Sequence, residues 1–175
     1  MLVIEYLKVE LGGKILLDHI DLEIKPGETH ILFGPNGSGK TSLLMTIMGY
    51  SQYKVVAGKM TFKGSDITTM PINERAKLGI GMSYQRPPTI NGLKTRQMVK
   101  ICGKGETDAE GLAKRVNFSE FLDRDVNAGF SGGEIKRSEL LQLMAQKPTS
   151  CFLMSRNPGW TWKTSISWAR RSPSF

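Results

Sequence analysis

The sequence has little cysteine and no long apolar run. Its two cysteines, Cys102 and Cys151, form neither a CxxC pair nor part of a Cys/His ligand set, which argues against a disulfide framework or a structural zinc site and favours a reducing compartment. Apolar stretches are only a few residues long, and charged residues already occur among the first ten. We therefore expect a cytoplasmic globular protein with no targeting leader and no direct membrane insertion.

Acidic residues are missing from the last part of the chain. The whole sequence carries 24 basic and 16 acidic residues, a net charge of +8. Residues 149–175 contain no Asp or Glu but hold four basic residues and all three tryptophans: Arg156, Lys163, Arg170, Arg171, Trp160, Trp162 and Trp168. Half of the excess charge thus lies in this tail. The remaining charge is ordinary and does not favour nucleic acid as a partner.

The pattern of the first fifty residues predicts strands followed by a helix. Residues 3–9 and 20–24 alternate apolar and polar side chains about the Gly12-Gly13 turn, which indicates an antiparallel layer. The short apolar run at 29–33 predicts another strand, and 41–48 predicts a helix. Between that strand and that helix lies a glycine-rich loop.

The later part of the chain becomes helical. Strands are expected at 59–62 and 79–83, with a helix begun by proline at 71–77. The stretch between Gly92 and Leu122 is helical in pattern, with a break at 103–105. A final helix at 131–145 has its N-cap at Ser131.

Residues 34–41 read GPNGSGKT and satisfy the pattern G-x-x-x-x-G-K-[ST]. Glycines in such a loop let backbone N–H groups approach a phosphate that a side chain would block. Lys40 would hold the phosphates as a point charge, and Thr41 would ligate Mg²⁺. An ordinary glycine turn is the alternative, but the strand before it and the helix after it are the expected context. We expect the phosphate contacts to come from Gly34, Asn36, Gly37, Ser38, Gly39, Lys40, Thr41 and Ser42.

Two further segments make this interpretation more specific. Residues 130–134 read FSGGE before a helix whose N-terminus can point at a phosphate; taken alone, they would be read as a helix cap. Gln85 follows the strand at 79–83 and precedes Arg86-Pro87-Pro88; taken alone, it would be a surface glutamine. Their order resembles that of ABC-type ATPases, in which a phosphate-binding loop, a Q-loop glutamine, a helical stretch and an LSGGQ signature follow one another.

The resemblance extends through Lys147 and implies the rest of the site. The fold expected is an α/β P-loop NTPase, an ABC-type nucleotide-binding domain at 1–148 with an antiparallel β layer, a helical subdomain at about 88–145 and its C-terminal part missing. The cofactors implied are ATP and Mg²⁺, with Lys40 and Gln85 catalytic and Thr41 and Gln85 at the metal. In a sandwich homodimer, Ser131, Gly132 and Gly133 would close on the ATP that the other copy holds.

Within that family the chain resembles the ATPase subunit of the SUF iron–sulfur cluster assembly machinery. The segments that carry this resemblance are QYKVVAG at 52–58, ERAKLGI at 74–80 and GGEIKRSE at 132–139. Glu134 stands where the signature usually has glutamine, and Glu139 where transporter subunits often have alanine. SUF scaffold proteins are then the expected partners. Many family members stack an aromatic ring on adenine where this chain has Leu11; Tyr6 is a candidate substitute, although a buried core position is expected for a strand tyrosine.

The family pattern breaks after Leu153. The family would continue with the Walker B pair, an Asp that orients Mg²⁺ and a Glu that polarises the attacking water, but Met154-Ser155 follows here. The later histidine that senses the γ-phosphate is missing too, since both histidines precede the loop at 34–41. We therefore expect an ATPase by family whose present chain binds nucleotide poorly and hydrolyses little of it.

A one-base frameshift near Pro148 is our explanation for the tail. Read one base earlier, the codons of Trp160 before Thr161 must give Asp, and those of Trp162 before Lys163 must give Glu. The steps from Leu153 onward permit the segment Asp-Glu-Pro-Glu-Ser-Gly-Val-Asp-Leu-Glu-Asn-Ile, which looks like Walker B and the segment after it. The rival explanation is a genuine basic tail that binds lipid or nucleic acid.

Three functions are open at this point. The first is the SUF assembly ATPase, and the second is the ATP-binding subunit of a membrane transporter, whose partner would be a permease. The third is a non-catalytic ATP-binding protein or pseudogene product.

Overall fold

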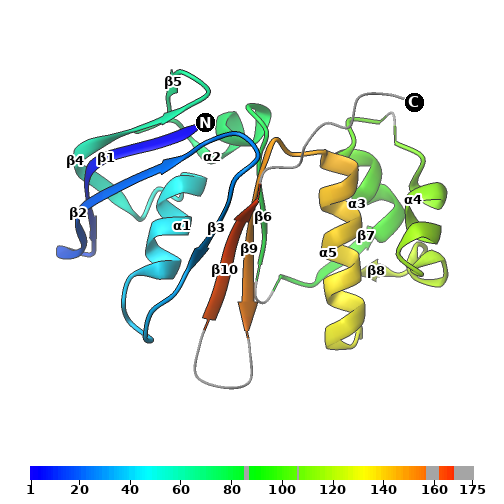
Figure 1. Ribbon diagram of the computed structural model, residues 1–175. Coiled ribbons are helices and arrows are strands. Elements are labelled where there is room, and N and C mark those ends of the chain that lie inside the picture. The colour runs from blue at the N-terminus through cyan, green and yellow to red at the C-terminus, as the bar shows by residue number, and fades with distance from the viewer. Residues whose placement is uncertain (85–86, 106, 157–161, 168–175) are drawn as a thin grey trace. The chain divides into compact units, whose positions relative to one another are not determined.

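The computed structural model describes residues 1–84, 87–105, 107–156 and 162–167. The chain divides into two compact units, one made of residues 1–82 with the segment from Thr149 and the other of Ser83–Pro148 (Figure 1). No helix in the described ranges is both long and apolar enough to cross a membrane. That residues 149–175 form a tail apart from the domain at 1–148 stays a prediction.

An antiparallel sheet opens the first unit. Its strands, in spatial order, are β2 (Lys14–Ile24), β1 (Leu2–Leu11), β4 (Lys54–Phe62) and β5 (Ser65–Asp66). Leu2 pairs with Ile24 on one side and Phe62 on the other, and all three side chains are fully buried. One face of the sheet therefore supplies the core, as the alternation of residue types predicts. The predicted antiparallel layer and its turn at Gly12-Gly13 are confirmed.

Tyr6 interrupts the regular pairing of β1. The expectation of a buried core position is wrong, because this side chain is 68% exposed. Tyr6 adopts a φ of +50° within a register shift of β1, and its N–H donates to Asp21 Oδ1 at 2.7 Å. Such an irregularity redirects a side chain, and the Tyr6 ring lies edge-on to the ring of His19.

A second sheet has the strand order β3 (Thr29–Leu32), β10 (Trp162–Ser167), β9 (Ser150–Arg156) and β6 (Ile80–Ser83). β10 is antiparallel to both β3 and β9. The strands predicted at 29–33 and 79–83 are confirmed as β3 and β6. The loop that follows β3 leads directly into α1 (Lys40–Met48), so strand, loop and helix occur in the predicted order.

Arg75 holds the far end of α1 in place. This residue belongs to α2 (Ile72–Lys77) and is 3% exposed. Its guanidinium donates to the carbonyl oxygens of Thr46 at 2.7 Å and Ile47 at 2.9 Å, in the last turn of α1, and to that of Met70 at 2.6 Å. Burial lowers the pKa of Arg75 to about 10, so the group is still charged at neutral pH. A cation at the carbonyl end of a helix is favourable.

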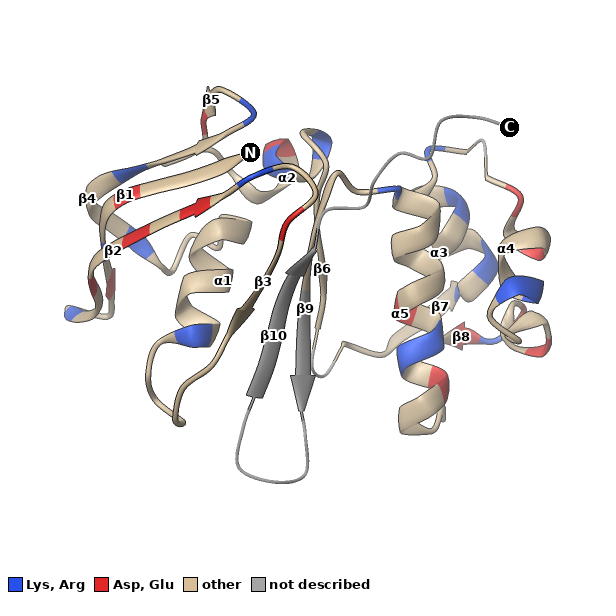
Figure 2. Ribbon diagram, in the orientation of Figure 1, with Lys and Arg blue, Asp and Glu red and all other residues tan. Residues whose placement is uncertain are grey.

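The second unit is mainly helical. Its elements are β7 (Ile90–Lys94), α3 (Thr95–Cys102), α4 (Ala109–Arg115), the 3-10 helix η1 (Ser119–Phe121), β8 (Asp125–Val126) and α5 (Gly132–Gln146). The helical pattern after Gly92 and its break at 103–105 are confirmed, except that 92–94 belong to β7. Ile90 pairs there with Val126, a partner too distant in the sequence to be read from local pattern. Acidic and basic residues both occur along α5 (Figure 2).

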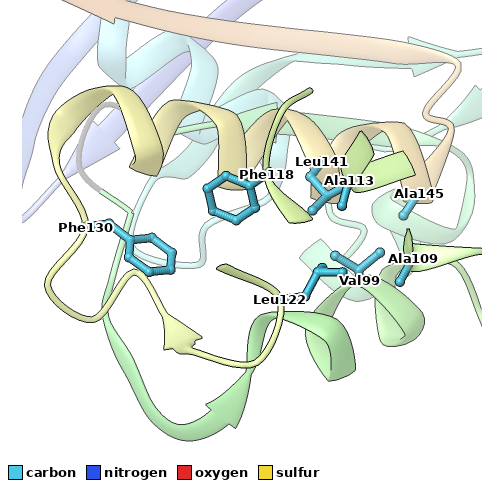
Figure 3. Packing of buried hydrophobic residues seen from close by; sticks show 8 residues of the cluster. All are labelled: Val99, Ala109, Ala113, Phe118, Leu122, Phe130, Leu141 and Ala145. Atoms are coloured by element: carbon cyan, nitrogen blue, oxygen red, sulfur yellow. The ribbon is translucent and has the colours of Figure 1, made fainter. Parts of the chain in front are cut away.

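The core of this unit lies between α3, α4 and α5 (Figure 3). It consists of Val99, Ala109, Ala113, Phe118, Leu122, Phe130, Leu141 and Ala145. Phe118 and Phe130 meet edge-on, with ring centroids 5.6 Å apart. Phe130 immediately precedes Ser131, so the core anchors the chain where α5 begins.

Candidate functional site

The loop between β3 and α1 depends on glycine. Gly37 and Gly39 have φ of +85° and +86°, a region that residues with a Cβ avoid. Gly39 is also crowded, because a Cβ there would lie 2.6 Å from Leu17 Cδ2. Gly39 is the N-cap of α1, and no side-chain capping hydrogen bond is present there among the described residues. The backbone N–H groups at the start of α1 therefore have no capping side chain from Gly39, and they are available to a ligand bound in the loop.

Lys40 is folded into its own loop. Its Nζ donates to the carbonyl oxygens of Gly34 at 2.7 Å and Pro35 at 2.6 Å, and to Ser38 Oγ at 3.3 Å. The residue is only 8% exposed. An ammonium group has three N–H donors, and here all three have oxygen acceptors. The positive charge is thus already fixed inside the loop that the sequence predicts to bind phosphate.

A hollow of about 400 Å³ opens beside this lysine. The residues that line it are Leu16, Asn36, Gly37, Gly39, Lys40, Thr41 and Ser42. Six of these seven are among the eight predicted contact residues. The other two predicted residues, Gly34 and Ser38, accept hydrogen bonds from Lys40. The structure therefore brings together every predicted contact residue of the loop. Their role in binding a nucleotide stays a prediction.

Leu16 is the lining residue that the sequence interpretation missed. It lies on β2 and is 37% exposed, whereas strand alternation at 20–24 drew attention only to the later part of this strand. An exposed apolar side chain next to a polar, cationic loop suits a ligand with an apolar ring and an anionic end. The signal available in the sequence was weak, because Ile15, Leu16 and Leu17 form an unbroken apolar run without alternation.

The fit to Mg²⁺ is only partial. Mg²⁺ in nucleotide sites is held by one or two carboxylates together with phosphate oxygens and waters. Thr41, an exposed residue in the first turn of α1, supplies a hydroxyl, but no Asp or Glu of the described part of the chain lines the hollow. Met154 and Ser155, where the family resemblance implies carboxylates, belong to β9 and carry none. The residues fit the phosphates of a nucleotide better than they fit its metal.

Ser131 begins α5 with a reciprocal pair of hydrogen bonds. Its backbone N–H donates to Glu134 Oε2 at 2.7 Å, and the N–H of Glu134 donates to Ser131 Oγ at 3.4 Å, which together form a capping box. The hydrogen bond from the Ser131 amide lowers the pKa of Glu134. The predicted N-cap is confirmed. Gly132 and Gly133 are exposed, and their amides donate to no group in the described part of the chain.

Arg124 holds the loop that leads to Ser131. Its guanidinium donates to the carbonyl oxygens of Ala128 at 3.0 Å and Gly129 at 3.4 Å. The same group lies over the Phe130 ring, 4.9 Å from the centroid, where a cation is attracted to the ring's electrons. The loop before Ser131 is therefore fixed by side-chain contacts of the second unit.

Gln85 lies outside the described residues, as do 157–161 and 168–175 of the tail. The predicted roles of Gln85 in catalysis and at Mg²⁺ therefore stay predictions. Its neighbours Ser83 and Tyr84 are described, and both contact α5.

Residues 17–153 match the family model described as ABC transporter. The chain belongs to the ABC transporter family. It is 39% identical over 166 residues to Vegetative protein 296 of Bacillus subtilis, covering 87% of this chain and 64% of that protein. It is 38% identical over 164 residues to the Iron-sulfur cluster assembly protein SufC of Plasmodium berghei, covering 85% of this chain and 45% of that protein. The chain thus spans less than two thirds of either relative.

A further relative and a solved structure are also similar to this chain. The Probable ATP-dependent transporter SufC of Escherichia coli is 33% identical over 175 residues, with 91% of this chain and 71% of that protein covered. Among solved structures, the ADP conformation of MJ1267, an ATP-binding cassette of an ABC transporter, has a TM-score of 0.69 and 23% identity over 86% of this chain and 66% of that chain. The predicted family and the P-loop NTPase fold are confirmed. The family match ends at Leu153, immediately before Met154-Ser155.

Proposed function

We propose that this chain binds ATP through residues 34–42 and derives from an ATPase of iron–sulfur cluster assembly of the SUF type. The observation that carries the proposal is the hollow beside the N-terminus of α1, lined by Asn36, Gly37 and Lys40 among others. Backbone amides, a buried ammonium and a helix N-terminus together suit a polyphosphate. Relatives named SufC support the assembly role.

The ammonium of Lys40 is the group whose removal tests nucleotide binding. Lys40→Ala in the full chain removes the one cation that lines the hollow among the described residues, so affinity for a fluorescent ATP analogue should fall at least about tenfold, which corresponds to about 1.4 kcal/mol. Lys14→Ala, which removes an exposed lysine from β2 of the same unit, is the matched control and should bind as the unchanged protein does. Equal affinity in all three proteins would reject the proposal.

Hydrolysis by this chain should be slow. Thr41 offers one oxygen to Mg²⁺, and Met154 and Ser155 can neither orient the metal nor polarise a water. Phosphate release measured at saturating ATP should therefore stay near the level of Lys40→Ala. Steady turnover that Lys40→Ala abolishes would show that other groups supply the missing carboxylates.

The assembled form that we propose is a nucleotide sandwich of two copies. Ser131, Gly132 and Gly133 of one copy would face the ATP held by Lys40 and Thr41 of the other, and scaffold proteins of the SUF machinery would be the partners in the cytoplasm. The exposure of all three signature residues is compatible with a contact in trans. Sedimentation with and without ATP tests the dimer, since ATP should raise the fraction of dimer and Gly133→Trp should prevent it.

An ABC transporter subunit is the second candidate. Relatives named Probable ATP-dependent transporter ycf16, such as that of Cyanidium caldarium at 36% identity, favour it. A permease gene beside the coding gene would support transport, whereas a SUF scaffold gene would support assembly.

We also propose that the tail results from a frameshift near Pro148. The end of the family match at Leu153 and the absence of acids after it support this interpretation. The coding DNA tests it directly. If its codons from Leu153, read one base earlier, do not spell a segment that begins Asp-Glu, the frameshift is rejected.

A further inference from the structure

Glu139 is a buried carboxylate on α5 that nucleotide binding leaves unused. Its side chain is only 7% exposed, and it stands where transporter subunits often have alanine. Both carboxylate oxygens have donors, one from the last residue of β6 and one from the residue that follows it. Oε1 accepts the backbone N–H of Tyr84 at 2.6 Å, and Oε2 accepts the hydroxyl of Ser83 at 3.0 Å. A buried charge is stable only when it is hydrogen-bonded and paired.

Lys136 completes the arrangement from one turn earlier on α5. Its Nζ donates to Glu139 Oε2 at 2.7 Å and to the backbone carbonyl of Tyr84. The spacing of three residues puts both side chains on one face of the helix. The N–H and the C=O of Tyr84 are thus both held by α5, in the way that a neighbouring strand would hold them.

The chain just after residues 85–86 is hydrogen-bonded to a residue shortly before α5. Asn127, which is 5% exposed, donates from Nδ2 to the carbonyl of Pro88 at 2.8 Å. The backbone carbonyl of Asn127 accepts a hydrogen bond from the hydroxyl of Thr89 at 3.4 Å. Asn127 lies four residues before Ser131 in the sequence. Both flanks of Gln85 are therefore tied to the segment that carries Ser131, Gly132 and Gly133, all within the second unit.

We propose that Glu139 is a positioning residue that fixes the backbone of Tyr84 to α5. The chain that enters Gln85 then moves together with the helix whose first residues are Gly132 and Gly133. This role rests on the proposed function, in which Gln85 and the Ser131 segment act on ATP. It touches no nucleotide itself and acts through the Tyr84 peptide.

Hydrogen–deuterium exchange of the full chain, first without nucleotide, tests the contact. Glu139→Ala should speed exchange in the peptide that contains Ser83 and Tyr84 at least about tenfold, because the Tyr84 amide loses its acceptor. Glu139→Gln keeps an acceptor oxygen of the same reach and should restore most of the protection. Leu140→Ala, at the next residue of α5 and 49% exposed, is the matched control and should change nothing at Tyr84. Circular dichroism shows whether each variant folds. If Glu139→Ala does not fold, the exchange rates at Ser83 and Tyr84 in Glu139→Gln and Leu140→Ala are compared instead.

Exchange with added ATP separates this proposal from the proposed function. In the unchanged protein ATP should slow exchange at 34–41 and in the peptide with Ser83 and Tyr84; Glu139→Ala should remove only the second effect. If ATP slows neither segment, the proposed function fails, while the nucleotide-free data still decide the contact. Three results overturn the positioning role: no change at Tyr84 in Glu139→Ala, an equal increase across all peptides of the second unit, or ATP-dependent slowing at Tyr84 that survives the substitution.

Discussion

The loop at 34–41 and the segment at 130–134 both place glycines before a helix, but they are held in different ways. In the first, left-handed backbone at Gly37 and Gly39 shapes the loop, and the N-cap residue of α1, Gly39, has no side chain that could cap the helix. In the second, Gly132 and Gly133 are ordinary helical residues behind the capping box of Ser131. The first segment uses glycine for its conformation. The second segment does not need glycine for its backbone conformation. The effect of its glycines is that no side chain fills the space in front of the first turn of α5.

The stabilising charges of the two segments also differ. In the first, the ammonium of Lys40 lies inside the loop and is bonded to backbone carbonyls. In the second, Glu134 bonds back to the Ser131 amide, and Arg124 holds the preceding loop from outside. An anion that enters the first loop therefore meets a cation already in place, whereas the second offers exposed amides only. This difference suits a primary phosphate site and an accessory contact, respectively.

Alanine substitution of matched glycines should show this difference most strongly. Gly39→Ala combines a φ of +86° with a Cβ 2.6 Å from Leu17, and we expect it to lower the free energy of unfolding by about 2 kcal/mol. Gly37→Ala has the same strain but open space around it, so its cost should be smaller. Gly133→Ala meets no atom and lies within a helix, so it should stabilise by about 0.5 kcal/mol. Denaturant unfolding followed by circular dichroism measures all three. Equal costs would mean that the two segments use glycine for the same reason.

Local pattern predicted those features of the two segments that depend on neighbours in sequence. Ser131 is predicted as a cap because it begins a stretch whose apolar residues have helical spacing, and the loop at 34–41 is predicted because a strand and a helix flank it. Tyr6 could not be placed, since its outward direction depends on a register shift against β2. The short strand β7 was missed because Ile90 pairs with Val126. The contacts of Glu139 with Ser83 and Tyr84 span more than fifty residues, and the family resemblance singles out Glu139 only as an acidic residue where transporter subunits often have alanine.

The capping box of the second segment should have an effect of intermediate size. Ser131→Ala removes the acceptor of the Glu134 amide, so α5 should lose about 1 kcal/mol, measured as the free energy of unfolding in denaturant. Ser131→Thr keeps a hydroxyl at the same place and serves as the control, with a much smaller loss expected. If the two variants unfold alike, the hydroxyl is not what caps α5, and the segment is held by Arg124 and Phe130 instead.

The smallest effect concerns the charge on Glu134. The amide of Ser131 lowers its pKa from 4.5 in the folded state, so the ionised form stabilises the fold. That contribution is complete above the unfolded pKa near 4.5 and is lost as the pH falls through the lower folded value. Glu134→Gln can still accept the Ser131 N–H but does not titrate. The melting temperature of the unchanged protein should therefore fall slightly more than that of Glu134→Gln between about pH 5 and pH 3. Other carboxylates with lowered pKa, such as Asp123 and Asp125, titrate equally in both proteins. The difference between the two curves of melting temperature against pH therefore measures the contribution of Glu134 alone.

Parallel curves would show that the capping box does not depend on the charge of Glu134. The second segment would then be held by neutral hydrogen bonds and packing alone.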